Sequence, residues 1–354
     1  MLLYITTGEP RDREVRPLHT VPETMTKLFY MSMREHSRPA VLRRWKPDGW
    51  EDDPDWRFDR QVIRTGIYLR ERLRVAEGDR VAVSGVMDLL WVQVDLAVQA
   101  LRAIPVGMHD GLSDDGLAAA IVETGCKVAF ATDATSGARL LKLLEAGHIA
   151  NVILPAENLD RADGAIQLSA MRTLSETLDT PERARQFHNS ANAVSPQDPA
   201  GIHFSPGDGK APLKQEFTHE QAMRFVKDRT GRCPAQQEDF VFFETRSVTV
   251  STRLSYQTAI GDGYTALALP EPGTSAQIAE LEPAKIVASA KWIESLCTDL
   301  SSAAGNGRGR KMREALRQRV GKKIRWIEPA ETISADCEKL LVAGGLPIAG
   351  RPIQ

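Results

Sequence analysis

Apolar and polar residues alternate over the first 155 positions in a pattern typical of strands separated by helices. Short apolar runs predict buried strands in "GDRVAVSGV", "IPVGM", "KVAFATD" and "NVILPA". The segments between them, "MDLLWVQVDLAVQALRA", "SDDGLAAAIVETG" and "ARLLKLLEA", predict helices. Strands that alternate with helices favour right-handed crossovers and a mostly parallel sheet. The helix "RFDRQVIRTGIYLRERLRV" and the strand "PAVLRRW" are expected before this series.

Capping residues predict where three of the helices begin. Thr20 with Glu23 forms a T-x-x-E capping box ahead of "TKLFYMSMREH". Ser113 is the expected N-cap of "DDGLAAAIVETG". Thr218 with Gln221 forms a T-x-x-Q box that starts "HEQAMRFVKDR".

The expected fold class is α/β, with two lobes whose largely parallel sheets are flanked by helices. Residues 1–20 read as an irregular N-terminal arm, 21–195 as the first lobe and 196–354 as the second. Residues 156–200 are polar and read as a surface connection, with the boundary near Pro196 to Pro199. Further strands are expected in "GIHFS", "DFVFFETR", "TALALPE" and "KIVASA", and further helices in "WIESLCTDLSSAA" and "MREALRQRV".

Composition excludes several classes of partner. The 45 basic and 47 acidic residues nearly cancel, so no overall field attracts nucleic acid or an anionic membrane. The four cysteines lack metal-ligand spacing and predict reduced, mostly buried thiols. Neither a signal peptide nor an apolar run long enough to span a membrane is found, so we expect a cytoplasmic protein. The basic segment "RGRKMREALRQRVGKKIR" reads as a solvated helix face, with an anionic ligand, membrane surface or acidic partner as alternatives.

The order of these segments resembles the AMP-forming acyl-CoA synthetases of the adenylate-forming superfamily. The family repeats "GDRVAI", "DLA" and "VPLYPT" in this order. The matching positions here are Gly78, Asp79, Arg80, Val81, Trp91, Asp95, Leu96, Ala97, Pro105 and Ser113. Farther on, "EPAKIVASAKWIESL" and "KKIRWIEPAETIS" resemble two later motifs, which together suggest the long-chain fatty acid branch.

"IHFSPGDGKAPLKQEFTH" resembles the phosphate-binding loop of that family, Y-T-S-G-T-T-G-x-P-K-G followed by a helix. Such a loop needs small residues, free backbone N–H groups and a lysine near the phosphates. Here Pro206 lacks an N–H, Asp208 adds a negative charge, and Leu213 stands where lysine is expected. The retained or substitute nucleotide-binding residues implied by the resemblance are Ser205, Gly207, Gly209, Lys210, Lys214 and Thr218. A turn kept only for its shape and a weakened nucleotide site both stay open.

Other family motifs are also altered. Glu328 to Ser334 stand where "S-G-G-A-P-L-S" lies along the adenine, and "FFETRSVTVS" lacks the family's histidine. The sequence stops where Y-G-x-T-E, with its magnesium-binding glutamate, is expected, ahead of the lobe that carries the catalytic lysine. No catalytic or metal-binding residue is therefore assigned, and binding of ATP, AMP and Mg²⁺ is expected to be weakened.

The sequence thus predicts a truncated synthetase-like protein that is inactive alone and binds a partner, an acyl ligand or a nucleotide. The expected partners are a second copy in a homodimer or a full-length acyl-CoA synthetase. The tail is expected to expose an association surface, lined by Leu340, Leu341, Val342, Leu346, Ile348 and Ile353, with the alternative that it folds back and covers its own edge. The alternative is the front part of a split fatty acid-CoA ligase that another chain completes. The altered loop favours the first hypothesis, because a split enzyme would still need its phosphate cradle.

Overall fold

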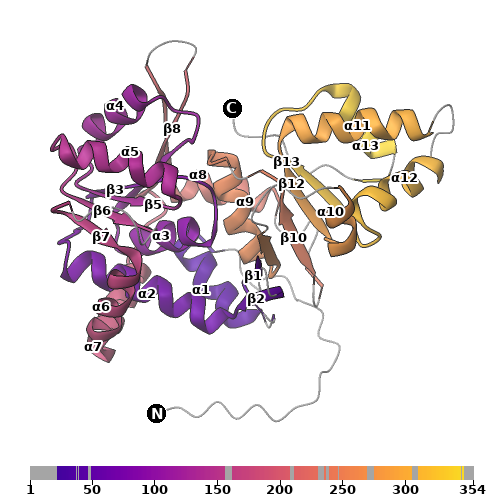
Figure 1. The fold of residues 1–354 in the computed structure, drawn as a ribbon. Helices are drawn as coiled ribbons and strands as arrows, with labels where there is room; N and C mark the ends of the chain where they lie inside the picture. The colour runs from indigo at the N-terminus through magenta and orange to yellow at the C-terminus, as the bar shows by residue number, and fades with distance from the viewer. Residues whose placement is uncertain are drawn as a thin grey trace, which may run out of the picture.

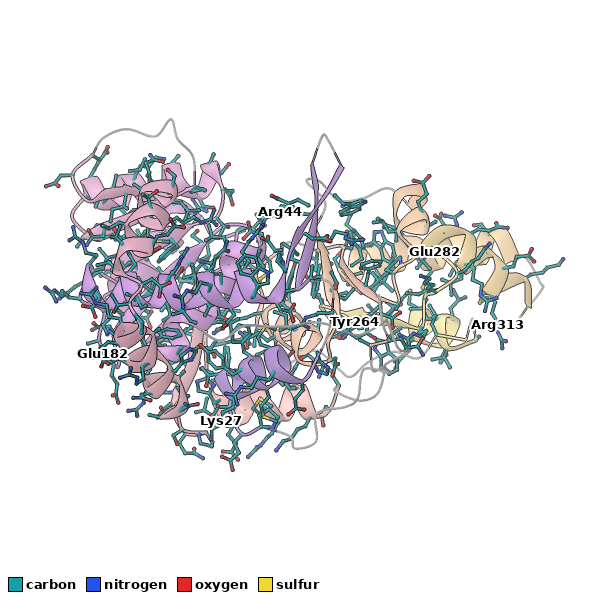
Figure 2. The ribbon with its side chains drawn as sticks, turned by 90° about the horizontal axis from the view of Figure 1, so that it is seen from below. Lys27, Arg44, Glu182, Tyr264, Glu282 and Arg313 are labelled. Atoms are coloured by element: carbon teal, nitrogen blue, oxygen red, sulfur yellow. The ribbon has the colours of Figure 1, made fainter. Side chains whose placement is uncertain are left out.

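Two sheets, each flanked by helices, organise the chain in the computed structural model (Figure 1). The structure describes residues 22–346 except 37, 39, 47–48, 156–161, 208–210, 230–234, 237–238, 246, 269–274, 305–309 and 344. The predicted arm, 1–20, lies outside the described residues. Figure 2 shows the molecule from below, with Tyr264, which is fully buried, near its middle.

The first sheet has seven strands in the order β7-β6-β5-β3-β4-β8-β9. All neighbours are parallel except β8 and β9, which form an antiparallel hairpin. The strands are β3 (Arg80–Ser84), β4 (Ile104–Met108), β5 (Val128–Ala131), β6 (Asn151–Leu154), β7 (Ala165–Gln167), β8 (Pro199–Ser205) and β9 (Leu213–Thr218). The helices between them are α3 (Leu89–Ala100), α4 (Asp114–Thr124) and α5 (Ala134–Glu145). The predicted parallel α/β arrangement is confirmed in this sheet.

The second sheet has six strands in the order β13-β12-β10-β11-β1-β2. Only β1 and β2 pair antiparallel. The strands are β1 (Leu42–Lys46), β2 (Gly49–Asp53), β10 (Phe240–Phe243), β11 (Thr265–Ala268), β12 (Lys285–Ala288) and β13 (Trp326–Pro329). Its helices are α9 (Val250–Gly261), α10 (Ser275–Leu281), α11 (Ala290–Ala304), α12 (Arg310–Val320) and α13 (Ala335–Ala343).

The two sheets do not divide the chain at the predicted boundary near residue 196. Strand β1, from the first part of the chain, pairs with β11, so that Leu42 lies opposite Ala266. Strands β8 and β9, which follow residue 196, belong to the seven-stranded sheet. The limits of the two lobes stay a prediction, but each sheet draws strands from both sides of that position.

Residues 156–200 are more than the polar surface connection that their composition predicts. They contain α6 (Leu168–Leu178) and α7 (Pro181–Asn192), which pack against α2 (Asp55–Glu71). The Phe187 ring is fully buried against Gly66, where a Cβ would lie 2.1 Å from the ring. A few well-placed apolar residues are thus enough to dock these helices, although most of their positions are polar.

The first helix begins later than the predicted capping box. Helix α1 (Met25–Glu35) has Thr24 as its N-cap, whose hydroxyl accepts a hydrogen bond from the Lys27 N–H. Proline disfavours helical backbone at the residue before it, so Pro22 opposes a start at Thr20. The other two caps, Ser113 and the Thr218–Gln221 box that begins α8 (His219–Lys227), are confirmed.

Helix α9 is buried on all sides and connects the two parts of the molecule. Its twelve residues are all buried, and it packs against α1, α3, α8 and β11. Arg253 on α9 forms an ion pair with Asp95 on α3, with Nη2 2.5 Å from Oδ1. Its Nη2 also donates to the Ala200 carbonyl oxygen on β8. This helix therefore fixes the position of β8, which leads into the predicted phosphate loop.

The chain end does not present the full apolar surface that the sequence predicts. Leu341 and Leu346 are buried in the core beneath α11, because α13 packs back onto the helix layer. Leu340 is partly buried, and Val342 is exposed. Ile348 and Ile353 lie outside the described residues. Among the described helices, none has the length and apolar character needed to cross a membrane.

Candidate functional site

The predicted phosphate loop forms the turn of the β8–β9 hairpin, which projects from the seven-stranded sheet (Figure 1). Ser205 pairs with Leu213 at the last register position before the turn. Gly209 and Lys210 lie outside the described residues. At Gly207 a Cβ would lie 2.5 Å from the Ala211 carbonyl oxygen, so a side chain is excluded by the loop's own backbone.

The Lys214 amine already forms ion pairs within the protein. Its Nζ lies 3.1 Å from the Glu123 carboxylate on α4 and 2.5 Å from that of Glu216 on β9. These hydrogen bonds, first with Glu216 and then with Glu123, stabilise the charged amine and raise the pKa of Lys214. The lysine that could replace the family residue is thus held by one carboxylate on α4 and one on β9.

Thr218 and His219 hold α8 in place. The Thr218 hydroxyl accepts a hydrogen bond from the Gln221 N–H, and the Gln221 side chain accepts one from the Thr218 N–H. His219 is buried, and its Nδ1 accepts a hydrogen bond from the Met25 N–H at 3.2 Å. Burial lowers the pKa of His219 to about 4, which keeps the ring neutral as this contact requires. Both side chains therefore accept hydrogen bonds from the backbone that hold α8 and α1 in place.

The carboxyl ends of β4 and β8 meet the segment that follows β10. The Ser247 hydroxyl donates to Asp110 at 3.3 Å and joins this segment to the end of β4. In parallel α/β sheets ligands bind at the carboxyl ends of strands, which makes this edge the candidate site. The Ser205 hydroxyl lies at the same edge, half exposed, and within the described part of the chain no hydrogen bond of its side chain is found.

His203 lies beneath this edge without a hydrogen-bond partner for either ring nitrogen among the described residues. It is 1% exposed, and its ring approaches that of His109 edge-on, with centroids 6.4 Å apart. Gly107 leaves room for it, since a Cβ there would lie 3.0 Å from its Nδ1. Burial, with smaller contributions from His109 and Arg253, lowers the pKa of His203 to about 3.

The segment from Glu328 to Ser334, which resembles the family's adenine-binding motif, begins with a buried carboxylate. Glu328, 1% exposed, lies 2.7 Å from the Lys285 amine and 3.2 Å from the Arg229 guanidinium. The Ser255 hydroxyl donates a further hydrogen bond to it. Burial would raise the pKa of Glu328, but Lys285 and Arg229 outweigh it and hold the pKa below its usual range. Sequence reasoning missed this cluster, since its members lie on four different segments of the chain.

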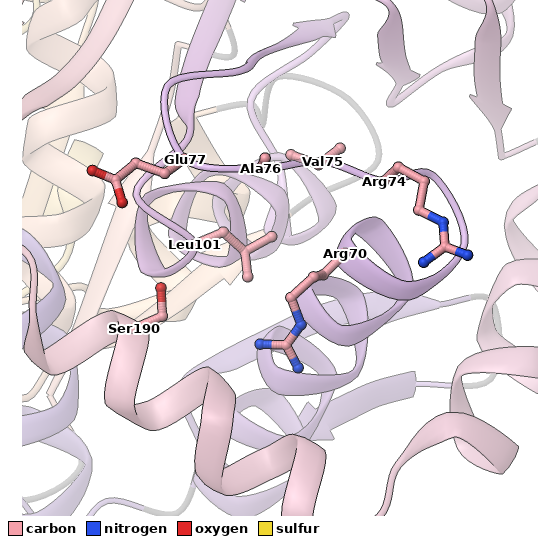
Figure 3. Close-up of a pocket in the computed structure, with 7 residues that line it drawn as sticks. All are labelled: Arg70, Arg74, Val75, Ala76, Glu77, Leu101 and Ser190. Atoms are coloured by element: carbon pink, nitrogen blue, oxygen red, sulfur yellow. The ribbon is translucent and has the colours of Figure 1, made fainter.

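A cavity of 370 Å³ lies at the opposite end of the seven-stranded sheet (Figure 3). It is lined by residues that precede β3 and β4, together with α2 and α7. Arg70 and Glu77 both contribute to its wall, and the Arg70 guanidinium donates to Glu71 at 3.0 Å. Because β4 and β8 run parallel, this cavity is remote from Ser205 at the carboxyl end of β8.

Comparison with protein-family models shows which known proteins the chain is similar to. Residues 57–207 match the model described as AMP-binding enzyme, from α2 to the loop after β8. This part of the chain is therefore similar to the AMP-binding enzymes. The match includes Asp95 and Ser205 and ends at Gly207, inside the altered loop. No curated protein matches the chain at a significant level.

Solved structures of ligases share the fold of this chain. The anthranilate CoA ligase AuaEII, solved with anthranoyl-AMP, has a TM-score of 0.67 and 14% identity, covering 94% of this chain and 60% of its own. A benzoate CoA ligase from Burkholderia xenovorans LB400 has a TM-score of 0.65 and 15% identity, covering 92% and 60%. A fatty acyl CoA synthetase of Mycobacterium tuberculosis has a TM-score of 0.63 and 12% identity, covering 92% and 58%. The chain thus spans about 60% of the length of these neighbours, and the likeness shows the shared fold.

Proposed function

We propose that this ligase-like protein does not catalyse adenylation alone and acts by binding a ligand or a partner. The observation that carries the proposal is the state of Lys214, whose amine is held by Glu123 and Glu216. A lysine assists phosphate binding only when its charge faces the phosphates, and two carboxylates beside it repel them instead.

Two further features support the absence of catalysis. Pro206 offers no backbone N–H to a phosphate oxygen directly after β8. Glu328 places a carboxylate, paired inside the lobe, where the resembling family has a serine before two glycines. Phosphoryl transfer depends mainly on positioning and on positive charge around the phosphates, so these changes remove central contributions to the rate.

The ligand that we propose is an acyl group or a weakly held nucleotide, with a long-chain fatty acid as the acyl class. The resemblance of the later motifs to the long-chain branch supports the fatty acid. The partner that we propose is a second copy of the chain or an intact acyl-CoA synthetase. Since Leu341 and Leu346 are buried, the exposed Val342 is the described tail residue that such a contact could use.

ATP–pyrophosphate exchange with fatty acids of short to long chain tests the absence of catalysis. We expect the protein to show no exchange above that of a Ser205→Ala variant, because the half-exposed Ser205 hydroxyl is the loop group best placed to serve phosphate. Exchange that clearly exceeds the variant's, and that depends on an added fatty acid, would contradict the proposal. Light scattering at micromolar concentration tests self-association. A protein that stays monomeric at all concentrations would contradict the proposed homodimer.

The second candidate is the front part of a fatty acid-CoA ligase that a separate chain completes. It rests on the resemblance to fatty acid-CoA ligases, and the solved ligases that align with over nine-tenths of this chain share its fold. Adding the product of an adjacent reading frame that begins near Y-G-x-T-E should then restore exchange. If the mixture stays inactive while the two products bind each other, the non-catalytic proposal is retained.

A further inference from the structure

Two of the four cysteines meet between helices α11 and α13. The Cys297 thiol points toward the backbone of Cys337, with its Sγ 3.8 Å from the Cys337 carbonyl oxygen. The Cys337 side chain also lies close enough to contribute, after burial, to the raised pKa of the Cys297 thiol. Both residues belong to the same apolar cluster on the helix side of the six-stranded sheet. They are therefore neighbours in space although forty positions separate them in the sequence.

The two thiols differ in their access to solvent. Cys297 is 5% exposed, whereas Cys337 lies near the start of α13 and is partly exposed. Cys126, by contrast, is fully buried beside the Thr124 hydroxyl, and no other described cysteine is recorded in contact with it. One accessible thiol with a second, sheltered thiol beside it is the arrangement that reversible disulfide formation requires.

We propose that Cys297 and Cys337 form an intramolecular disulfide when the protein meets a peroxide, so that α13 becomes covalently joined to α11. The site is independent of the proposed function, because it lies on the helix layer of the six-stranded sheet and includes no residue of the phosphate loop.

The chemistry proceeds in two steps that balance. The Cys337 thiolate attacks one peroxide oxygen, the O–O bond breaks, and the hydroxide that leaves takes up a proton to become water. The Cys297 sulfur then attacks the sulfenic sulfur of Cys337, the S–O bond breaks, and the hydroxyl leaves as a second water with the Cys297 proton. Two thiols lose two electrons, and one peroxide is reduced to two waters.

The order of the steps follows from the surroundings of the sulfurs. Burial, with a further contribution from Cys337, raises the pKa of Cys297 to about 12, so it remains a thiol until its partner is oxidised. Thiolates are the reactive form, and Cys337 is the exposed member of the pair. Cys337 is therefore the thiol that meets the oxidant, and Cys297 is the thiol that resolves it.

Peptide mapping of the whole protein tests the proposal. The purified chain is treated with hydrogen peroxide, alkylated and digested without reductant. We expect a linked pair of peptides that contain Cys297 and Cys337, which dithiothreitol separates, together with a severalfold slower hydrogen exchange in α13. The Cys126→Ser variant should keep the link, and the Cys297→Ser and Cys337→Ser variants should lose it.

The unaltered protein decides the outcome even if a variant fails to fold. A Cys297 thiol that stays open to alkylation after unfolding, while Cys337 is found as a sulfinic acid, would overturn the proposal. A link between Cys337 residues of two chains would overturn it as well.

Discussion

At the scale of single residues, the interior contains buried charged side chains that have defined partners. Arg253 and Asp95 are both at most 1% exposed and are joined by two hydrogen bonds, from Nε and Nη2. Gly201 makes room for the guanidinium, since a Cβ there would lie 2.0 Å from Arg253 Nη1. Burying two ions is costly, but removing one of them leaves the other without compensation.

Arg253→Met should therefore lower the free energy of unfolding by about 3–5 kcal/mol, because Asp95 would remain buried without its partner. Urea denaturation measures the loss. Arg185→Met, which removes a pair with Glu182 on the exposed face of α7, should change stability by about 1 kcal/mol or less. Equal effects of the two variants would show that the buried pair is not as isolated from water as the structure indicates.

His203 should make the protein sensitive to acid. Its folded pKa of about 3 lies below the ordinary value of 6.5, so the unfolded chain takes up the proton first as the pH falls. Stability is complete above about pH 6.5, and about 2 kcal/mol is lost by pH 5 from this residue alone.

His203→Leu should remove that part of the pH dependence, while His148→Leu, on the surface, should leave it unchanged. Thermal unfolding between pH 7 and pH 5 compares the three proteins. His219 retains a share of the sensitivity in all of them, because its pKa is also lowered by burial. An unaltered pH profile in the His203→Leu protein would contradict the assignment.

At the scale of elements, local pattern predicts the helices and strands of the parallel sheet but not what they contact. The apolar runs of β3 to β6 and the cap at Ser113 are readable because each depends on neighbouring residues. Helix α9 escapes prediction because its buried positions include serine, threonine, arginine and glutamine, which leave neither an apolar run nor an apolar face to read. The pairing of β1 with β11 and the contact of Lys214 with Glu123 join distant parts of the chain, which no local pattern encodes.

Thr218 should act as a helix cap. Thr218→Ala should lower the free energy of unfolding by about 1 kcal/mol, because the Gln221 N–H loses its acceptor. Thr218→Ser keeps the oxygen and should retain most of the stability. Thr177→Ala, on the exposed side of α6, is the matched control and should be nearly neutral. If Thr218→Ala is as neutral as this control, the capping box does not hold α8 in place.

At the scale of the whole molecule, the chain has the fold of the solved ligases, while the loop after β8 departs from the phosphate-binding motif that it resembles. The family match covers the seven-stranded sheet up to Gly207, and the shared fold extends over more than nine-tenths of the chain. Helix α9 still joins both sheets through buried contacts. A shared fold, in which Lys214 is already paired with Glu123 and Glu216, fits the proposal of a protein that binds without adenylating.

Calorimetric titration of ATP with Mg²⁺ tests this central claim most directly. The protein should bind ATP only weakly, with no saturation below millimolar ATP, and a Glu123→Gln/Glu216→Gln variant should bind it more tightly because Lys214 is released toward the loop. A Glu145→Gln/Glu182→Gln variant, which changes the charge equally at exposed sites, should resemble the unaltered protein. Micromolar ATP binding by the unaltered protein, unchanged when Glu123 and Glu216 are replaced, would contradict the account.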